Sequence, residues 1–577
     1  MALPAGVTYN WIFPFYAITN ASVYNGQQFQ WLFYRPLYMF GGNNTNVTVN
    51  YPLSPANAPV YSDGGKTVTI NFKGWKWSDG ETVGANSFLF YMNMVEAEKS
   101  QWYAYAPHLL PDNVVSYKAQ GPNTIVMQLD KPYSSLWFTY NQLAEITPMP
   151  EAWDVTKLGA SAGSGGCLKD SASDHWAKCK SVYTFLTAQS KNAATYATSP
   201  LWSVVNGPWK LKSFSTSGNV SIVPNTKYSG SPKPKLSEID FKPFTSDTTE
   251  YTAVKTGELD VGYIPTQDLP QKPVSSVLPP TNPLGSNYNL QPFYAYAVAY
   301  YQPNFNNATV GPMFRQLYVR QALQYLVDQN GMAKAAWQGY AYPDSGPVPP
   351  KPANPFLSTA QKLNGGLGPY AFSIAKAKAL FAAHGWKVVS GMQTCENPSL
   401  CGTGIAKGTQ MKFSIDYSTG VAAFTDMMEA YKSDANQAGI GINIVGQSFN
   451  TILGEGSPCP SPGSTKLSSK CTAQALEAGG WAFDGPGFEP TGEPLFSTGA
   501  GSNSGNYTNA QMDKLINLTH TTSGYPTFYN YANYTTQQLP YIFMPVNYGI
   551  QAVSSKLHGV TFNPDYVFTP EYWYLTK

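Results

Sequence analysis

The chain has 577 residues, which is too long for a single hydrophobic core, so two or three domains are expected. Charged residues make up only 12% of the sequence, about half of the usual ~25%, and the net charge is +2. Lysine and arginine form no stripe of the kind that binds nucleic acid, so no nucleic-acid partner is expected. Because a neutral polar surface changes charge little as carboxylates protonate, an acidic extracellular habitat is a hypothesis.

No transmembrane helix is expected, because the sequence has no run of 18 apolar residues. Residues 1–6 also lack the charged and apolar regions of a signal peptide. For an exported protein, this start implies that the signal has been removed and that Met1 is an added start residue.

The six cysteines fall into three local pairs: Cys167 with Cys179, Cys395 with Cys401, and Cys459 with Cys471. Fifteen connectivities are possible for six cysteines, and pairing of neighbours is the simplest. None of the pairs has the C-x2-C spacing of a zinc site. Three local disulfides would place the chain in an oxidising compartment, whereas six free thiols in a cytosolic protein are the alternative.

A strand, a turn and a helix follow one another within residues 68–98. Residues 68–72 alternate apolar and polar side chains, which predicts a half-buried strand. The Ser-Asp-Gly sequence at 78–80 predicts a turn. From about Ala85 the apolar spacing becomes i, i+3, i+4, i+7, one face of a helix, with Asn86 or Ser87 as its N-cap.

The passage W-x-W-S-D-G-E-x-V within this segment resembles the signature of family 5 extracytoplasmic solute-binding proteins, the peptide and nickel receptors of ABC importers. Further motifs follow in the family's order, at 129–133, 206–211, 256–260, 318–323, 347–350, 374–386 and 481–486. The resemblance implies an α/β fold with two lobes, like the type II periplasmic binding proteins of the large cluster, with an extra subdomain in lobe I.

The resemblance also implies a division of the chain. Residues 1–295 would form lobe I, with the subdomain at roughly 50–200; residues 296–538 would form lobe II; and residues 539–577 would return to lobe I. Within lobe II, a strand at 413–417, a helix at 424–439 and a strand at 440–445 predict a parallel crossover.

The resemblance points to a ligand site in the W-x-x-D passage. In peptide-binding members, the aspartate of this passage binds the α-ammonium group of the ligand, and that role carries over only to Asp484, which Trp481 and Phe483 flank. Asp484 is followed by Gly-Pro-Gly where many relatives carry Tyr-Pro-Asp, so a turn residue is the alternative. Trp11 and Phe13 are further candidates for the pocket wall, and a core position is equally consistent with them.

No enzyme motif stands in its required context. The five histidines show neither H-x-x-x-H nor H-E-x-x-H spacing. The G-x-S-x-G match at 159–163 has no strand before it, and the sequence at 64–67 lacks the first glycine of a P-loop. No catalytic residue, cofactor or metal is therefore expected, and a secreted hydrolase is the minor alternative. Arg320 could bind a carboxylate or serve as a structural partner.

The expected function is that of a receptor whose lobes close by hinge motion on an oligopeptide and deliver it to an ABC permease in the membrane. An oligosaccharide or another small solute is the alternative ligand, because aromatic faces also suit sugar rings. The expected protein is a monomer outside the cytoplasm, at the cell surface or in the periplasm, and membrane-tethered in its full-length precursor.

Overall fold

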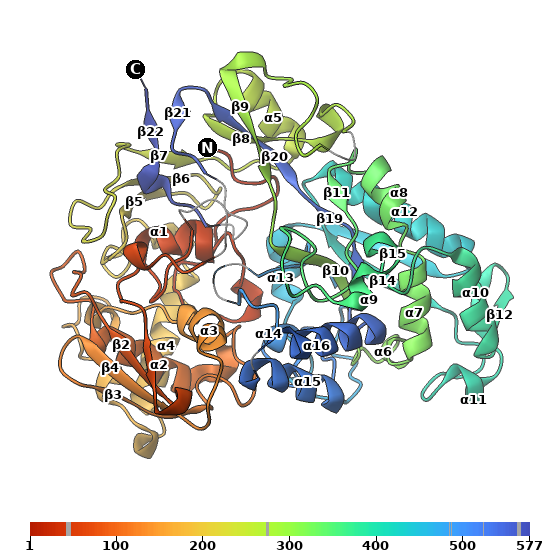
Figure 1. Ribbon diagram of the computed structural model, residues 1–577, viewed down its shortest axis with the longest axis horizontal. Coiled ribbons are helices and arrows are strands. Elements are labelled where there is room, and N and C mark those ends of the chain that lie inside the picture. Colours follow the sequence, from red (N-terminus) through yellow and green to blue (C-terminus); the bar gives the residue numbers. More distant parts are fainter. Residues whose placement is uncertain are drawn as a thin grey trace.

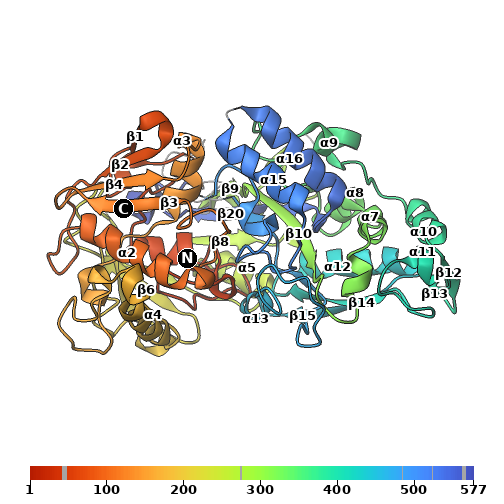
Figure 2. The ribbon, with the colours of Figure 1, turned by 90° about the horizontal axis from the view of Figure 1, so that it is seen from below.

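The computed structural model describes residues 1–41, 48–272, 276–483, 485, 487–522, 524–561 and 567–576. Their apolar side chains form two large buried clusters. One is built mainly from residues 1–261 and 553–573, and the other mainly from residues 251–552. We call the parts of the chain around these two clusters lobe I and lobe II; Figures 1 and 2 show them side by side.

Lobe I contains two small antiparallel sheets. The first has the order β1-β2-β4-β3, and the second the order β5-β6-β7. Their strands are β1 (Val60–Ser62), β2 (Thr67–Asn71), β3 (Val114–Ala119), β4 (Thr124–Leu129), β5 (Trp209–Phe214), β6 (Val220–Pro224) and β7 (Ile239–Phe241). The helices of this part are α1 (Trp31–Phe33), α2 (Ala85–Glu98), α3 (Ser135–Trp137) and α4 (Ala177–Ser190). The next helix, α5 (Asp247–Lys255), packs its buried apolar side chains into the other cluster.

The predicted strand, turn and helix of 68–98 are confirmed as β2 and α2, but the predicted N-cap is wrong. Gly84 is the N-cap, and no side chain caps the helix. The Ala85 N–H donates to the carbonyl of Pro122 at 2.8 Å, so a neighbouring loop provides the acceptor. The Ser87 hydroxyl instead accepts a bond of 3.2 Å from Nε1 of the buried Trp77, which anchors the tryptophan-rich corner to the helix.

Lobe II is built on a six-stranded sheet of order β15-β14-β16-β10-β17, with β18 also paired to β10. The strands are β10 (Ala297–Pro303), β14 (Lys412–Ser418), β15 (Gly441–Gln447), β16 (Ala475–Glu477), β17 (Trp481–Ala482) and β18 (Ile542–Met544). Strands β14 and β15 are parallel and are joined by α12 (Ala422–Gln437), which confirms the predicted crossover.

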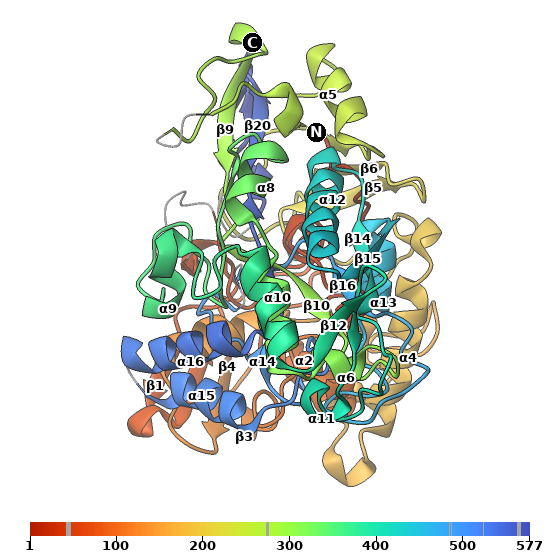
Figure 3. The same ribbon diagram turned by 90° about the vertical axis from the view of Figure 1, so that its right-hand side faces the viewer.

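Helices and small hairpins cover this sheet. The helices are α6 (Gly311–Phe314), α7 (Leu317–Tyr325), α8 (Gln329–Ala335), α9 (Thr359–Lys362), α10 (Ile374–Ala383), α11 (Pro398–Cys401), α13 (Phe449–Glu455), α14 (Glu493–Phe496), α15 (Ala510–Thr521) and α16 (Tyr525–Gln538). The hairpin of β12 (Trp386–Val389) and β13 (Met392–Cys395) lies near α10 and α11, on the side that faces the viewer in Figure 3.

A third sheet, of order β8-β20-β9, lies between the two clusters and contributes side chains to both. Its strands are β8 (Val261–Ile264), β9 (Tyr288–Phe293) and β20 (Gly549–Ser554). The chain passes from this sheet to lobe II after β9 and returns to it before β20. Just before this return, β19 (Val546–Asn547) pairs with β11 (Ala341–Tyr342). The rings of Tyr294 and Tyr548 stack at these two passages, 4.5 Å apart.

The chain ends with β21 (Leu557–His558) paired to β22 (Tyr574–Leu575). The predicted boundaries at 295 and 538 stay predictions, although β18 still pairs with the lobe II sheet beyond residue 538. No helix among the described residues is both long and apolar enough to span a bilayer.

The predicted disulfides are confirmed. Cys167 pairs with Cys179, Cys395 with Cys401 and Cys459 with Cys471, with Cα atoms 4.3, 6.2 and 5.5 Å apart. Each bridge closes a local loop, so it restricts the unfolded chain over a short span only.

A buried ion pair holds the C-terminal segment in lobe I. The guanidinium of Arg35 contacts the carboxylate of Glu571, and neither side chain is accessible to solvent. Arg35 also donates to the carbonyl of Trp31 at 3.1 Å and lies over the ring of Tyr228. We expect Glu571→Ala to lower the free energy of unfolding by about 3–5 kcal/mol, because it leaves an uncompensated buried charge.

Urea unfolding at constant pH measures this loss. In the control, Arg35→Met is combined with Glu571→Leu, and the double variant should lose much less stability because no charge stays buried alone. A loss below about 1 kcal/mol in Glu571→Ala would show that water reaches Arg35 in the folded protein.

Buried carboxyl groups make the stability of the fold depend on pH. Burial raises the pKa of Glu250 in α5 to about 8 and that of Glu477 in β16 to about 7. The folded state therefore binds more protons than the unfolded state between pH 4.5 and 8, and stability falls as the pH rises through this window. We expect the melting temperature to be higher at pH 5 than at pH 8.

The matched variant is Glu250→Gln, which cannot ionise and should flatten this dependence by up to about 1.4 kcal/mol per pH unit. Glu250 accepts a hydrogen bond of 2.7 Å from the Tyr263 N–H, so a glutamine oxygen can replace the carboxylate oxygen there. Calorimetric melting across pH 5–8 is the measurement, and a wild-type melting temperature that rises with pH would contradict the expectation.

Candidate functional site

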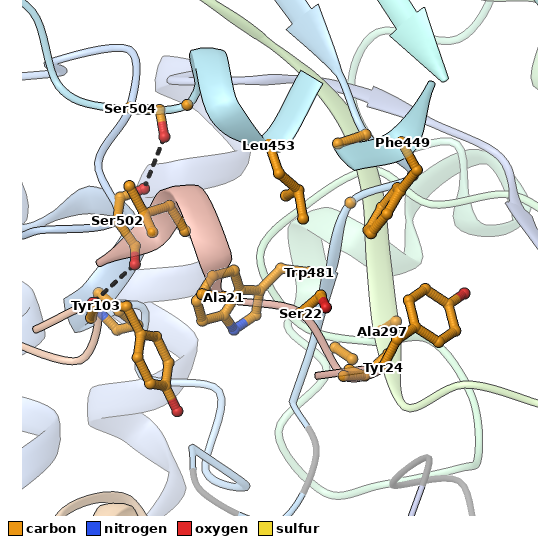
Figure 4. Close-up of a pocket in the computed structure, with 18 of the residues that line it drawn as sticks. Ala21, Ser22, Tyr24, Tyr103, Ala297, Phe449, Leu453, Trp481, Ser502 and Ser504 are labelled. Carbon is orange, nitrogen blue, oxygen red and sulfur yellow. Dashed lines mark hydrogen bonds between the residues drawn. The ribbon is translucent and has the colours of Figure 1, made fainter. Parts of the chain in front are cut away.

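A cavity of about 290 Å³ lies between the two lobes. Its lining comes from segments far apart in the sequence: lobe I contributes residues from 4–27 and 103–145, and lobe II contributes residues from 297–302 and 418–504. Figure 4 shows part of this lining, with Trp481 between Tyr103 on one side and Phe449 and Leu453 of α13 on the other. The volume lies near the lower end of the range of ~300–1,000 Å³ for ligand pockets.

Strand pairing places Trp481 in the cavity wall. In β17, Trp481 pairs with Val298 of β10, and a turn that contains Gly479 and Gly480 connects β16 to β17. A Cβ atom on Gly480 would lie 1.9 Å from the carbonyl oxygen of Val298, so only glycine permits this close pairing. Trp481 is half-buried and presents part of its ring to the cavity.

Tyrosines form part of the opposite wall. The rings of Tyr16 and Tyr103 stack with their centroids 5.2 Å apart. The hydroxyl of Tyr103 donates to Oε2 of Glu145 at 2.6 Å, and the carbonyl of Tyr103 accepts a bond of 2.7 Å from the Ser502 hydroxyl of lobe II. This side of the cavity is thus tied to the other lobe by a direct hydrogen bond (Figure 4).

Among the described residues, three carboxyl groups line the cavity: Glu145 from lobe I, and Glu489 and Glu493 from lobe II. Burial, reinforced by the nearby charge of Glu493, raises the pKa of Glu145 to about 8 and that of Glu489 to about 7. Burial alone would also raise the pKa of Glu493, but His520 and the Thr491 hydroxyl bring it below its ordinary value. At neutral pH, Glu493 is therefore the ionised member of the group.

Glu493 is held by donors from both lobes. Its Oε1 accepts from Nε1 of Trp137 and from Nδ2 of Asn141, both at 3.1 Å and both from lobe I. Its Oε2 accepts from Thr491 and lies 3.6 Å from Nε2 of His520, whose ring stacks on Trp137 at 4.0 Å.

Asn141, from lobe I, also forms hydrogen bonds with the backbone of lobe II. Its side chain donates to the Glu489 carbonyl at 2.8 Å and accepts from the Glu489 N–H at 3.1 Å. This amide from the helical turn Phe138–Gln142 therefore ties lobe I to the segment that carries two of the three cavity carboxylates.

The predicted site residues have different locations. Trp481 and Phe483 both line the cavity, and Phe483 is also packed against Tyr296. Asp484 lies outside the described residues, so its role stays a prediction. Trp11 and Phe13 are not among the described residues that line the cavity; they are 5% and 0% exposed and belong to the lobe I core, where Phe13 packs against Trp153 and Trp202.

The sequence interpretation missed Glu145, Glu489 and Glu493. One signal could have found the last two: residues 472–513 contain five acidic residues and no lysine, arginine or histidine. Arg320 is buried and donates to the carbonyls of Phe314 and Gln538, so of its two predicted roles it has the structural one. No group of three metal-ligating side chains occurs in the part of the chain that the structure describes.

Comparisons with known proteins agree with this architecture. Residues 53–503 match the model of a protein family described as "Bacterial extracellular solute-binding proteins, family 5 Middle". The oligopeptide-binding protein OppA of Bacillus subtilis is 24% identical over 297 residues, which cover 50% of this chain and 47% of that protein. The nickel-binding periplasmic protein of Escherichia coli is 25% identical over 246 residues, 43% of this chain and 42% of that protein. The chain thus spans about half the length of these curated relatives.

Solved structures match the whole fold. The oligopeptide-binding protein AppA of Bacillus subtilis, in complex with a nonapeptide, has a TM-score of 0.75 at 16% identity and covers 100% of this chain and 99% of its own. The murein tripeptide binding protein MppA of Escherichia coli has a TM-score of 0.71 at 17% identity, with 100% and 98% covered. The two-lobe fold of type II periplasmic binding proteins is therefore confirmed, and the chain belongs to the bacterial extracellular solute-binding proteins of family 5.

Proposed function

We propose that this protein is an extracytoplasmic receptor that captures a peptide in the interlobe cavity and delivers it to an ABC permease. The observation that carries the proposal is the cavity itself, which is walled by both lobes in a chain of a solute-binding family. Two of the similar structures are those of proteins whose names specify an oligopeptide or a murein tripeptide. In the full-length precursor, the receptor is tethered to the outer face of the membrane.

Capture needs no covalent chemistry on this proposal. The half-buried Trp481 offers an apolar face, and the glutamates offer acceptors for N–H groups of the ligand. Closure of the lobes removes water, which strengthens each polar contact inside the cavity. The hydrogen bonds from Asn141 to Glu489 and Glu493 join the two lobes, so they would stabilise a closed, ligand-bound state.

We expect Trp481→Ala to weaken ligand binding by about 1.5–3 kcal/mol, because the variant loses a large apolar surface that the closed cavity buries against the ligand. Isothermal titration with tri- to hexapeptides and with oligosaccharides measures the affinity. Tyr525→Ala is the matched control, because Tyr525 is an exposed aromatic residue of α16 outside the cavity lining. Equal losses in both variants, or a response to sugars alone, would count against a peptide site at Trp481.

Asp484 has a separate test. If it binds the ligand's α-ammonium group, Asp484→Ala should weaken the binding of a free peptide by about 2–5 kcal/mol. An N-acetylated peptide lacks this ammonium group, so the same substitution should change its affinity little. Equal effects on the free and the acetylated peptide would remove Asp484 from the ammonium site.

A further inference from the structure

The cavity lining contains acidic side chains and no basic one among the described residues. Among the described residues, the lining includes three glutamates and no lysine, arginine or histidine. The residues that the structure does not describe contain no lysine, arginine or histidine apart from Lys577, so between residues 1 and 576 they add no basic side chain to the cavity. His520 is not part of the described lining; its Nε2 lies 3.6 Å from Oε2 of Glu493, and its ring stacks on Trp137.

Glu489 is the member of this group that is open to a ligand. Its side chain is only 6% exposed, yet it lines the cavity and accepts no hydrogen bond from any described residue. Its backbone N–H and carbonyl are both bonded to Asn141, so the residue is fixed while its carboxyl group stays unpartnered. A buried carboxylate without a partner is costly, and a cation that enters the cavity relieves that cost.

Glu145 presents a second acceptor from lobe I. Its Oε2 accepts from the Tyr103 hydroxyl at 2.6 Å, whereas its Oε1 accepts from no described side chain. The charge of Glu493 raises the pKa of both Glu145 and Glu489, so each of these two carboxylates is repelled by Glu493 when it ionises. Each of them therefore favours a positive group in the space they share.

We infer that the cavity selects ligands of net positive charge: it receives a free amine and offers no counter-charge to a carboxylate. This inference rests on the proposal that the cavity is the ligand site. A zwitterionic peptide would bring its carboxylate into a space with three acidic groups and no basic one, whereas a peptide amide or another amine with no acid group would not. The ligand class is thus amine-bearing and basic.

The test compares four forms of trialanine at pH 7: the free peptide, the amide, the N-acetyl acid and the N-acetyl amide. Titration calorimetry should show the amide binding at least about tenfold more tightly than the zwitterion, and the N-acetyl acid binding most weakly, since one amine pairs with several carboxylates. A zwitterion that binds as tightly as the amide overturns the charge preference and leaves the peptide receptor intact.

Glucosamine and N-acetylglucosamine separate this inference from the peptide proposal. If no form of trialanine binds but glucosamine binds at least tenfold more tightly than its acetylated form, the peptide proposal fails and the charge preference stands. If no amine probe binds at millimolar concentration, the cavity is not a site for cations and the inference is overturned.

Variants assign the preference to residues. Glu489→Gln keeps the shape of the side chain, and it should reduce the ratio of amide to N-acetyl amide affinity at least fivefold. Glu145→Gln, on the other wall, should reduce the same ratio and provides a second variant should the first one fold poorly. Glu429→Gln is the matched control, because Glu429 is exposed on α12 beside Lys432. An unchanged ratio in both cavity variants contradicts the inference.

Discussion

Carboxyl groups enclosed between two lobes without a basic partner are the constraint on which this site depends. Removing a carboxylate from water disfavours its charged form, and this explains why Glu145 and Glu489 hold protons near neutral pH. Glu493 stays ionised although it is buried, because its carboxylate contacts four partners: Trp137, Asn141, Thr491 and His520. One ionised and two readily ionised groups therefore share the cavity, and the ionised one is held by donors from the opposite lobe.

Stability and binding place opposite demands on these groups. Protonation stabilises the folded protein, because a neutral carboxyl group is buried at lower cost than a carboxylate. Capture of an amine needs the carboxylate. The ionised form of these groups would therefore bind a cation best, and it is also the form that costs the empty closed protein the most stability. Such conflicts are typical of functional sites, where a protein gives up stability for recognition. The hypothesis of an acidic habitat adds a consequence, since the cavity would attract cations less strongly as its carboxylates protonate.

The sequence predicted local features well and the composition of the site poorly. The alternation at 68–72, the helix from Ala85 and the parallel crossover in lobe II are all local patterns, and each was confirmed. The N-cap was wrong because the acceptor for Ala85 comes from Pro122, a tertiary contact. Glu489 and Asn141 are 348 residues apart in the sequence, so no local pattern encodes the hydrogen bond between them. Trp11 and Phe13 show the same limit, because an aromatic residue near the N-terminus suits a pocket or a core until the packing is known.

The opening and closing that the proposed function requires can be understood from the same electrostatics. The contacts across the cleft at Asn141 and Glu493 are hydrogen bonds, which water can replace when the lobes separate. Separation would also rehydrate Glu489 and Glu145, so the empty protein gains solvation free energy on opening. A ligand shifts this equilibrium only through its different affinity for the two states, and a cation among the carboxylates interacts far more strongly in the dry, closed cavity than in the open one. The burial of Glu145 and Glu489 without a basic partner, which destabilises the empty closed form, is therefore what would make closure depend on the ligand.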